Sequence, residues 1–185
     1  MTRGMGLAIL YTLGWLPLFF IRTESLTQAF PQYGRAERWS TAGSAAAMGV
    51  HMTLACIVVS LTEPISAVAA TLSVMLFVAG LGFWLWARIL IGPLRRPRLP
   101  EEPPLRLRSD GPFGVVRNPL YLGALTAAAA PLIVAPRPLL CVSYALCVGA
   151  LTMRAVQEER RLHQQLGAEY AVYCGRVKRL VPFVW

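Results

Sequence analysis

Apolar residues dominate five stretches of the chain, at about 5 to 21, 42 to 61, 65 to 91, 119 to 135 and 138 to 156. Each comes near the roughly 20 consecutive apolar residues that a helix needs to cross a bilayer. The chain is 56% hydrophobic with a mean hydropathy of +0.52, whereas soluble domains are usually about 45 to 50% apolar. The pattern predicts an all-α integral membrane protein with five transmembrane helices.

Proline and glycine mark where the last two of these helices begin and end. Asn118 followed by Pro119 is typical of an N-cap and a first helical position. The turn between the two helices is a short A-P-R-P sequence, which predicts an antiparallel hairpin. The last helix continues beyond its apolar part, and we expect it to end near Gly167 as a C-cap.

A segment rich in proline and arginine, 92 to 110, separates this hairpin from the first three spans. Its sequence, GPLRRPRLPEEPPLRLRSD, suits neither a helix interior nor a membrane span. The chain is therefore predicted to have two regions. Residues 1–91 form three amino-terminal spans, and residues 92–185 form the connector, the hairpin and a cytoplasmic tail.

The basic residues are distributed unevenly over the predicted loops. With five crossings, all 18 Lys and Arg residues except Arg3 and Arg137 fall on one side. Cytoplasmic loops carry such an excess, so this side and the C-terminus are predicted to be cytoplasmic. The use of Arg rather than Lys and the abundant Ala favour a bacterial inner membrane. Topology and anionic lipids account for the net charge of +9, so no nucleic-acid partner is predicted.

Candidate chemistry lies at the cytoplasmic ends of the hairpin. Arg117 stands just before a helix start, whose N–H groups favour a carboxylate or phosphate. Glu158 and Glu159 are expected about one turn beyond the bilayer on the same side, with Arg154 spaced to pair with Glu158. A zwitterionic small molecule would satisfy both ends. Alternatively, the acids are a solvated helix face and Arg117 is a headgroup anchor.

A histidine and four cysteines are the other residues with possible site chemistry. His51 lies within the second span, where an ionisable residue indicates function; the alternative is a neutral imidazole bonded to a neighbouring helix. The four cysteines show no C-x-x-C spacing, and no metal site is predicted.

Three sequence blocks follow one another in the second region. They are G-P-F-x-x-x-R-N-P-x-Y-x-G from Gly111, E-E-x-x-L-x-x-x-x-G-x-x-Y-x-x-Y from Glu158, and R-V at Arg176 with Pro182 close behind. In their order and spacing, residues 92 to 185 resemble the carboxy-terminal half of the isoprenylcysteine carboxyl methyltransferases and the related phospholipid methyltransferases.

The resemblance implies a membrane-embedded enzyme that binds S-adenosylmethionine on its cytoplasmic face and methylates a lipophilic substrate. It implies a cofactor site made by residues at matching positions, namely Arg117, Asn118, Tyr121, Leu122, Gly123, Glu158 and Glu159. It associates Arg117 and Arg176 with catalytic activity. The family usually has His at the position of Asn118.

The methyl acceptor and the reaction class both have alternatives. A carboxylate acceptor, like that of a prenylated cysteine, needs a cation such as Arg176 to orient it. A lipid amine or thiol needs a base, for which Glu159 or His163 is available. A membrane reductase of the sterol-reductase type, which binds NADPH, has similar carboxy-terminal helices, but adjacent carboxylates would repel its phosphates. The third hypothesis is a non-enzymatic membrane protein that binds lipid headgroups.

Overall fold

The computed structural model describes residues 2–28, 35–91 and 107–181, without the side chains of 16–28 and 35–38. All regular elements in these ranges are helices: α1 (Arg3–Gln28), α2 (Arg35–Ser60), α3 (Ala67–Ile91), α4 (Pro112–Val115), α5 (Pro119–Val134), α6 (Pro138–Leu166) and α7 (Ala168–Arg176). The predicted all-α fold is confirmed for this part of the chain.

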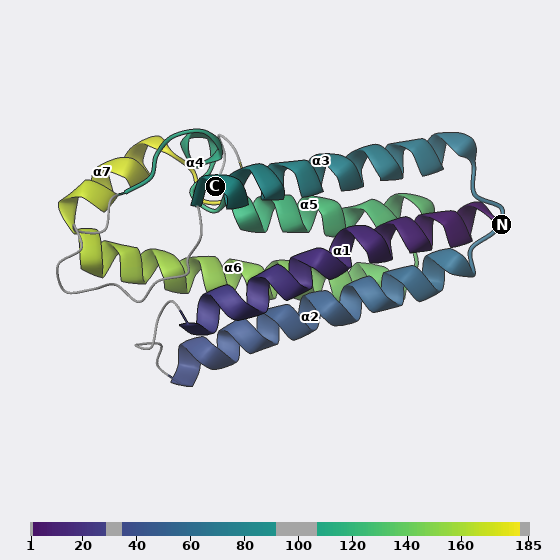
Figure 1. Ribbon diagram of the computed structural model, residues 1–185, viewed down its shortest axis with the longest axis horizontal. Helices are drawn as coiled ribbons and strands as arrows, with labels where there is room; N and C mark the ends of the chain where they lie inside the picture. The colour runs from purple at the N-terminus through teal and green to yellow at the C-terminus, as the bar shows by residue number, and fades with distance from the viewer. Residues whose placement is uncertain (1, 29–34, 92–106, 182–185) are drawn as a thin grey trace.

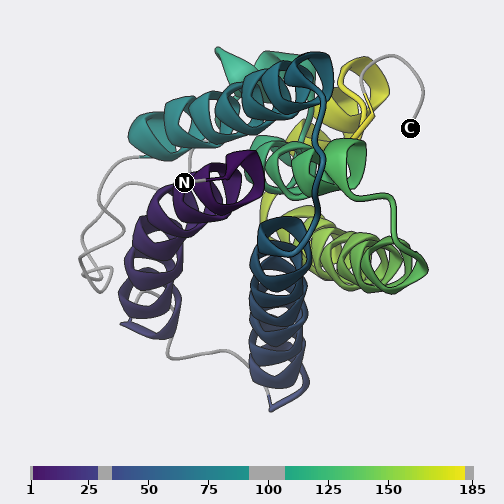
Figure 2. The ribbon, with the colours of Figure 1, turned by 90° about the vertical axis from the view of Figure 1, so that its right-hand side faces the viewer.

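The long helices α1, α2, α3, α5 and α6 lie roughly along one axis (Figure 1). The start of α1 and the α2–α3 and α5–α6 links lie at one end, whereas α4 and α7 lie at the other, hereafter the α7 end. α5 packs against α3, α6 and α2 and occupies the centre of the end-on view (Figure 2). α2, α3 and α6 therefore surround a central α5, and α1 packs against α2 and α3.

Within the part of the chain that the structure describes, three helices are long and apolar enough to cross a bilayer, over Trp39–Ser60, Ala67–Ile91 and Pro138–Leu166. α3 also exposes large apolar side chains at a spacing of three or four residues, namely Val68, Leu72, Met75 and Val78. Soluble monomers rarely expose a continuous row of large apolar side chains to water. In a bilayer, lipid tails would cover such a row, so its exposure carries no free-energy penalty there. The helices therefore support a membrane protein.

The first and fourth predicted spans differ from these three. α5 begins at the predicted residue and ends one residue before the predicted 119–135. Its 16 residues correspond to roughly 24 Å at the α-helical rise, which is less than the roughly 30 Å of a bilayer core. Its buried residues are distributed around the helix, because neighbouring helices rather than lipid surround it. α1 extends over 26 residues, but the side chains of its second half lie outside the described residues. The crossings by α1 and α5 stay predictions.

Buried polar side chains link other helices to α5. His51 on α2 is fully buried; its Nε2 donates to the Ala128 carbonyl at 2.9 Å and its Nδ1 lies 2.8 Å from the Ser143 hydroxyl on α6. Ser73 on α3 donates to the Ala130 carbonyl of α5. Of the two interpretations of His51, these contacts support a hydrogen-bonded link between helices.

The backbones of α3 and α5 are in direct contact at two glycines. A Cβ added at Gly80 would lie 2.4 Å from the Ala127 nitrogen and 2.8 Å from the Gly123 carbonyl oxygen. A Cβ at Gly123 would lie 2.6 Å from the Trp84 nitrogen. Small residues allow such close approach of helices in lipid.

We expect Gly80→Ala to lower the thermal stability of the protein, because its new methyl group would force the two backbones apart. Overpacking of this kind costs typically about 1–3 kcal/mol. Gly82→Ala on the same helix is the matched control, since no heavy atom lies within 4 Å of its added Cβ. Thermal unfolding in one detergent, followed by circular dichroism, measures both variants. Equal loss of stability in the two would contradict the described contact.

Candidate functional site

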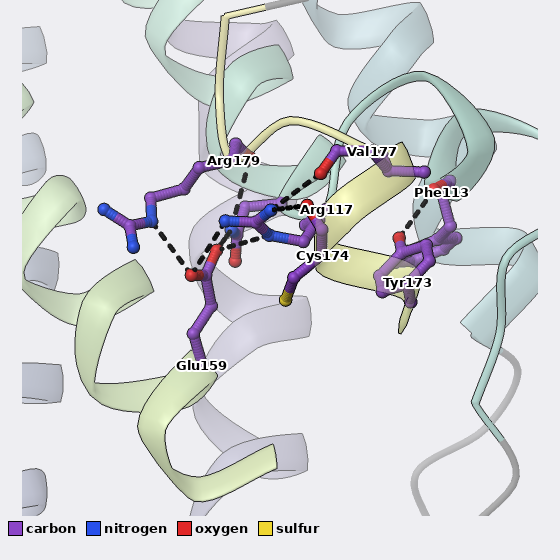
Figure 3. Close-up of polar contacts among 8 residues, drawn as sticks. Phe113, Arg117, Glu159, Tyr173, Cys174, Val177 and Arg179 are labelled. Atoms are coloured by element: carbon purple, nitrogen blue, oxygen red, sulfur yellow. Dashed lines mark hydrogen bonds and ion pairs between the residues drawn. The ribbon is translucent and has the colours of Figure 1, made fainter. Parts of the chain in front are cut away.

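Arg117 and Glu159 meet at the α7 end of the bundle. Arg117 precedes α5, and Glu159 lies on the part of α6 that extends beyond its apolar stretch. The Nε and Nη2 atoms of Arg117 donate to the two carboxylate oxygens of Glu159, each at 3.1 Å (Figure 3). Because a guanidinium and a carboxylate are both planar, this paired contact fixes their relative orientation.

Two further side chains bind the same carboxylate. The amide of Asn118 donates to Oε1 at 2.9 Å, and Nε of Arg179 donates to Oε2 at 2.9 Å. Arg117, Asn118, Glu159 and Arg179 are hereafter the Glu159 cluster. The Glu159 side chain is only 9% exposed, so these donors replace the water that an ionised carboxylate requires.

The Glu159 cluster also fastens the chain that follows α7. The remaining Arg117 nitrogen, Nη1, donates to the carbonyls of Cys174 at 3.1 Å and Val177 at 2.7 Å (Figure 3). The backbone N–H groups of Arg117 and Asn118 donate to the carbonyls of Lys178 at 2.7 Å and of Arg179 at 3.1 Å. Residues 177–179 are therefore held against the segment that leads into α5.

The local signals at the helix ends have the predicted positions. α5 begins at Pro119 with Asn118 as its N-cap residue, but the Asn118 side chain makes no capping hydrogen bond because it turns to Glu159. α6 ends at Leu166 with Gly167 as its C-cap residue. Gly167 has a φ of 53°, a backbone conformation that glycine adopts without strain.

The surroundings of Arg117 stabilise the positive charge of its guanidinium group. Burial opposes a charged guanidinium, but the hydrogen bonds and the negative charge of Glu159 outweigh it and raise the pKa of Arg117 above its ordinary value. Burial raises the pKa of Tyr173 to about 12, so its phenol stays protonated and donates to the Phe113 carbonyl at 2.6 Å. Both side chains therefore keep their hydrogen-bonding roles across the physiological pH range.

The neighbouring acid, Glu158, belongs to a different set of contacts. Its Oε1 accepts from the Tyr121 hydroxyl at 2.5 Å and from Nε of Arg154 at 3.0 Å. Nε of Arg154 also lies 2.6 Å from the Tyr121 hydroxyl. Tyr121, Arg154 and Glu158 are hereafter the Glu158 cluster. The Glu158 side chain is 38% exposed, so this carboxylate is open to solvent or a ligand.

Most residues of the predicted site come together, but not all. Arg117, Asn118, Tyr121, Glu158 and Glu159 form the two adjoining clusters. Leu122 is half-buried one residue further along α5, whereas Gly123 lies against α3.

Arg176 ends α7 with an exposed side chain, and the described contacts do not connect it to either cluster. Arg179 occupies the cation position beside Glu159 instead. Arg179 is not among the predicted site residues, and its place in a short basic run between Arg176 and Pro182 is the only signal for it in the sequence. The predicted pair of Arg154 and Glu158 does form, but the burial of Arg154 was not anticipated.

The described residues contain no group of three or more His, Cys, Asp or Glu side chains placed to hold a metal ion. What the site does offer is guanidinium donors, a tyrosine hydroxyl and one half-exposed carboxylate. This donor set suits an organic ligand that carries both a carboxylate and a cationic group.

Comparison of the chain with known protein families gives no match, and a search of curated proteins finds no significant relative. The function is therefore argued from the sequence and from the geometry of the site.

We expect Glu159→Gln to destabilise the protein, because it leaves two arginines without their counter-charge. Breaking a buried pair costs at least about 3 kcal/mol. Thermal unfolding and limited proteolysis after residue 176 measure the loss, and we expect faster cleavage of the tail as well as a lower melting temperature. Glu169→Gln is the control, since Glu169 is an exposed acid on the first turn of α7. If both variants behave like the wild type, the Glu159 cluster does not hold the tail.

Proposed function

We propose that the protein is an integral membrane methyltransferase that transfers the methyl group of S-adenosylmethionine to a lipophilic acceptor. One observation carries the proposal: three sequence blocks, which resemble those of the isoprenylcysteine carboxyl methyltransferases, meet in one polar site. The first block contributes Arg117 and Tyr121, and the second contributes Glu158 and Glu159. The third contributes the Val177 carbonyl, which accepts from Arg117, and Arg179, which donates to Glu159. Apolar helices next to this site support an acceptor that arrives from the lipid.

The proposed topology has five crossings, with the α7 end in the cytoplasm of a bacterial cell and the protein in its inner membrane. Arg3 and Arg137 belong to the elements at the opposite end, whereas the arginines of both clusters lie at the α7 end. This distribution agrees with the excess of basic residues on cytoplasmic loops. The amino-terminal region, 1–91, supplies the first three crossings, and 92–185 supplies the hairpin and the site.

The two acids have different roles in this proposal. Both oxygens of Glu159 already accept two hydrogen bonds each, so Glu159 holds the site together. Glu158 is the more exposed acid and faces the cationic groups of the cofactor, while Tyr121 packs beside it. The bound cofactor supplies an electrophilic methyl group on a sulfonium.

The remaining work of the protein is to align the acceptor and to exclude water, since methyl transfer is an in-line displacement. Both oxygens of Glu159 are occupied by donors, so Glu159 is poorly placed to remove a proton from an amine or thiol. His163, the other candidate base, has an exposed side chain outside both clusters. These positions favour an acceptor that is already ionised, such as a carboxylate on a prenylated or similarly lipophilic molecule, with the exposed Arg176 available to orient it.

The main alternative is a membrane protein without catalytic activity that binds lipid headgroups. It is favoured by the fact that both oxygens of Glu159 are fully paired by protein donors, as in a purely structural cluster. A reductase that binds NADPH is a weaker alternative, because Glu158 and Glu159 would repel the phosphates of the dinucleotide.

We expect the detergent-purified protein to bind S-adenosylmethionine and not NADPH in calorimetric titrations. Glu158→Gln should weaken the binding about 10-fold or more, the typical effect of losing a charged hydrogen-bond partner. Glu169→Gln, which changes an exposed acid, should bind like the wild type.

Binding of NADPH alone would support the reductase instead. Binding of neither compound, together with binding to vesicles of anionic phospholipid, would support the non-enzymatic alternative.

A further inference from the structure

Arg154 has an unusual position for an arginine in a membrane protein. The residue is only 3% exposed. Its Nε is used by Tyr121 and Glu158, but its Nη1 is buried and has no hydrogen-bond partner among the described residues. A buried charged donor without a partner carries a desolvation penalty, and such groups in native proteins call for an explanation.

The surroundings of Arg154 are polar and close to the start of α5. Tyr121, on the first turn of α5, places its hydroxyl 2.6 Å from Nε of Arg154. The guanidinium carbon of Arg154 also lies 5.9 Å from the centre of the Tyr121 ring.

The charges in this region favour an anion. The two adjoining clusters contain the guanidinium groups of Arg117, Arg154 and Arg179 but only the carboxylates of Glu158 and Glu159. One positive charge is therefore in excess. Arg117 and Arg179 share Glu159, and Glu158 is partly exposed. Nη1 of Arg154 is the buried donor of these clusters that has no partner among the described residues.

We infer that Arg154 binds the carboxylate of an α-amino-acid group through Nη1, while Glu158 accepts from the ammonium group of the same ligand. An amino acid carries its two charges one carbon apart, and Arg154 and Glu158 present opposite charges 3.0 Å apart at Nε and Oε1. This inference rests on the proposed function, in which the amino-acid group is the methionine end of S-adenosylmethionine. It gives Arg154, which is not among the predicted site residues, a direct contact with the cofactor.

The test compares two ligands that differ only in this carboxylate: S-adenosylhomocysteine and its decarboxylated analogue, which keeps the amine. We expect the wild type to bind S-adenosylhomocysteine about 10-fold or more tightly than the analogue, as a charged hydrogen bond predicts. Arg154→Lys keeps the positive charge but lacks Nη1. In this variant the two ligands should bind with affinities within about 3-fold of each other, because the ligand carboxylate has lost its hydrogen-bond donor. Arg160→Lys is the control, since Arg160 is an exposed arginine on the same helix, and it should keep the full preference.

The outcomes separate this inference from the proposed function. A wild type that binds both ligands equally well overturns the role of Arg154 and leaves the methyltransferase proposal intact, and it does so without any variant. If Arg154→Lys keeps the full preference for S-adenosylhomocysteine, the role of Arg154 is likewise overturned and the methyltransferase proposal stands. A wild type that binds neither ligand overturns both the inference and the proposed function.

Discussion

The ion pair of Arg117 and Glu159 is the contact on which the α7 end of the molecule depends. It joins the start of α5 to the extension of α6, and the same guanidinium holds the chain after α7 through two carbonyls. A buried pair contributes little net stability, because desolvation offsets the attraction. Its value here is orientation, since the two-point contact and the donors from Asn118 and Arg179 permit one arrangement of three chain segments.

The parts of this arrangement that sequence could predict are those set by local signals. Asn118 and Pro119 mark the start of α5, and Gly167 marks the end of α6, because caps depend on a few neighbouring residues. The short A-P-R-P turn makes α5 and α6 antiparallel neighbours. From these facts alone, Arg117 and Glu159 had to lie at the same end of the bundle, and they do.

What sequence could not predict depends on contacts between distant segments. Nothing in the run that contains Arg179 distinguishes it from Arg176, yet one contacts Glu159 and the other is exposed. The resemblance put Gly123 in the cofactor site, whereas its close approach to α3 depends on Gly80, far away in the chain. Apolar length gave the bounds of α5 to within one residue, but it could not show that this helix packs against α2, α3 and α6.

The adjacent acids of the second block show how helix geometry divides two identical side chains between two tasks. Neighbouring residues on an α-helix point about 100° apart, so Glu158 and Glu159 cannot face the same partner. Glu159 points to Arg117 and Arg179 and is almost fully buried, whereas Glu158 points to Tyr121 and Arg154 and keeps an open side. The E-E pair is therefore better understood as two single-acid positions, one that holds the site together and one that is available to a ligand. A protein that needed the pair only for solubility would have no reason to bury a guanidinium beside each of them.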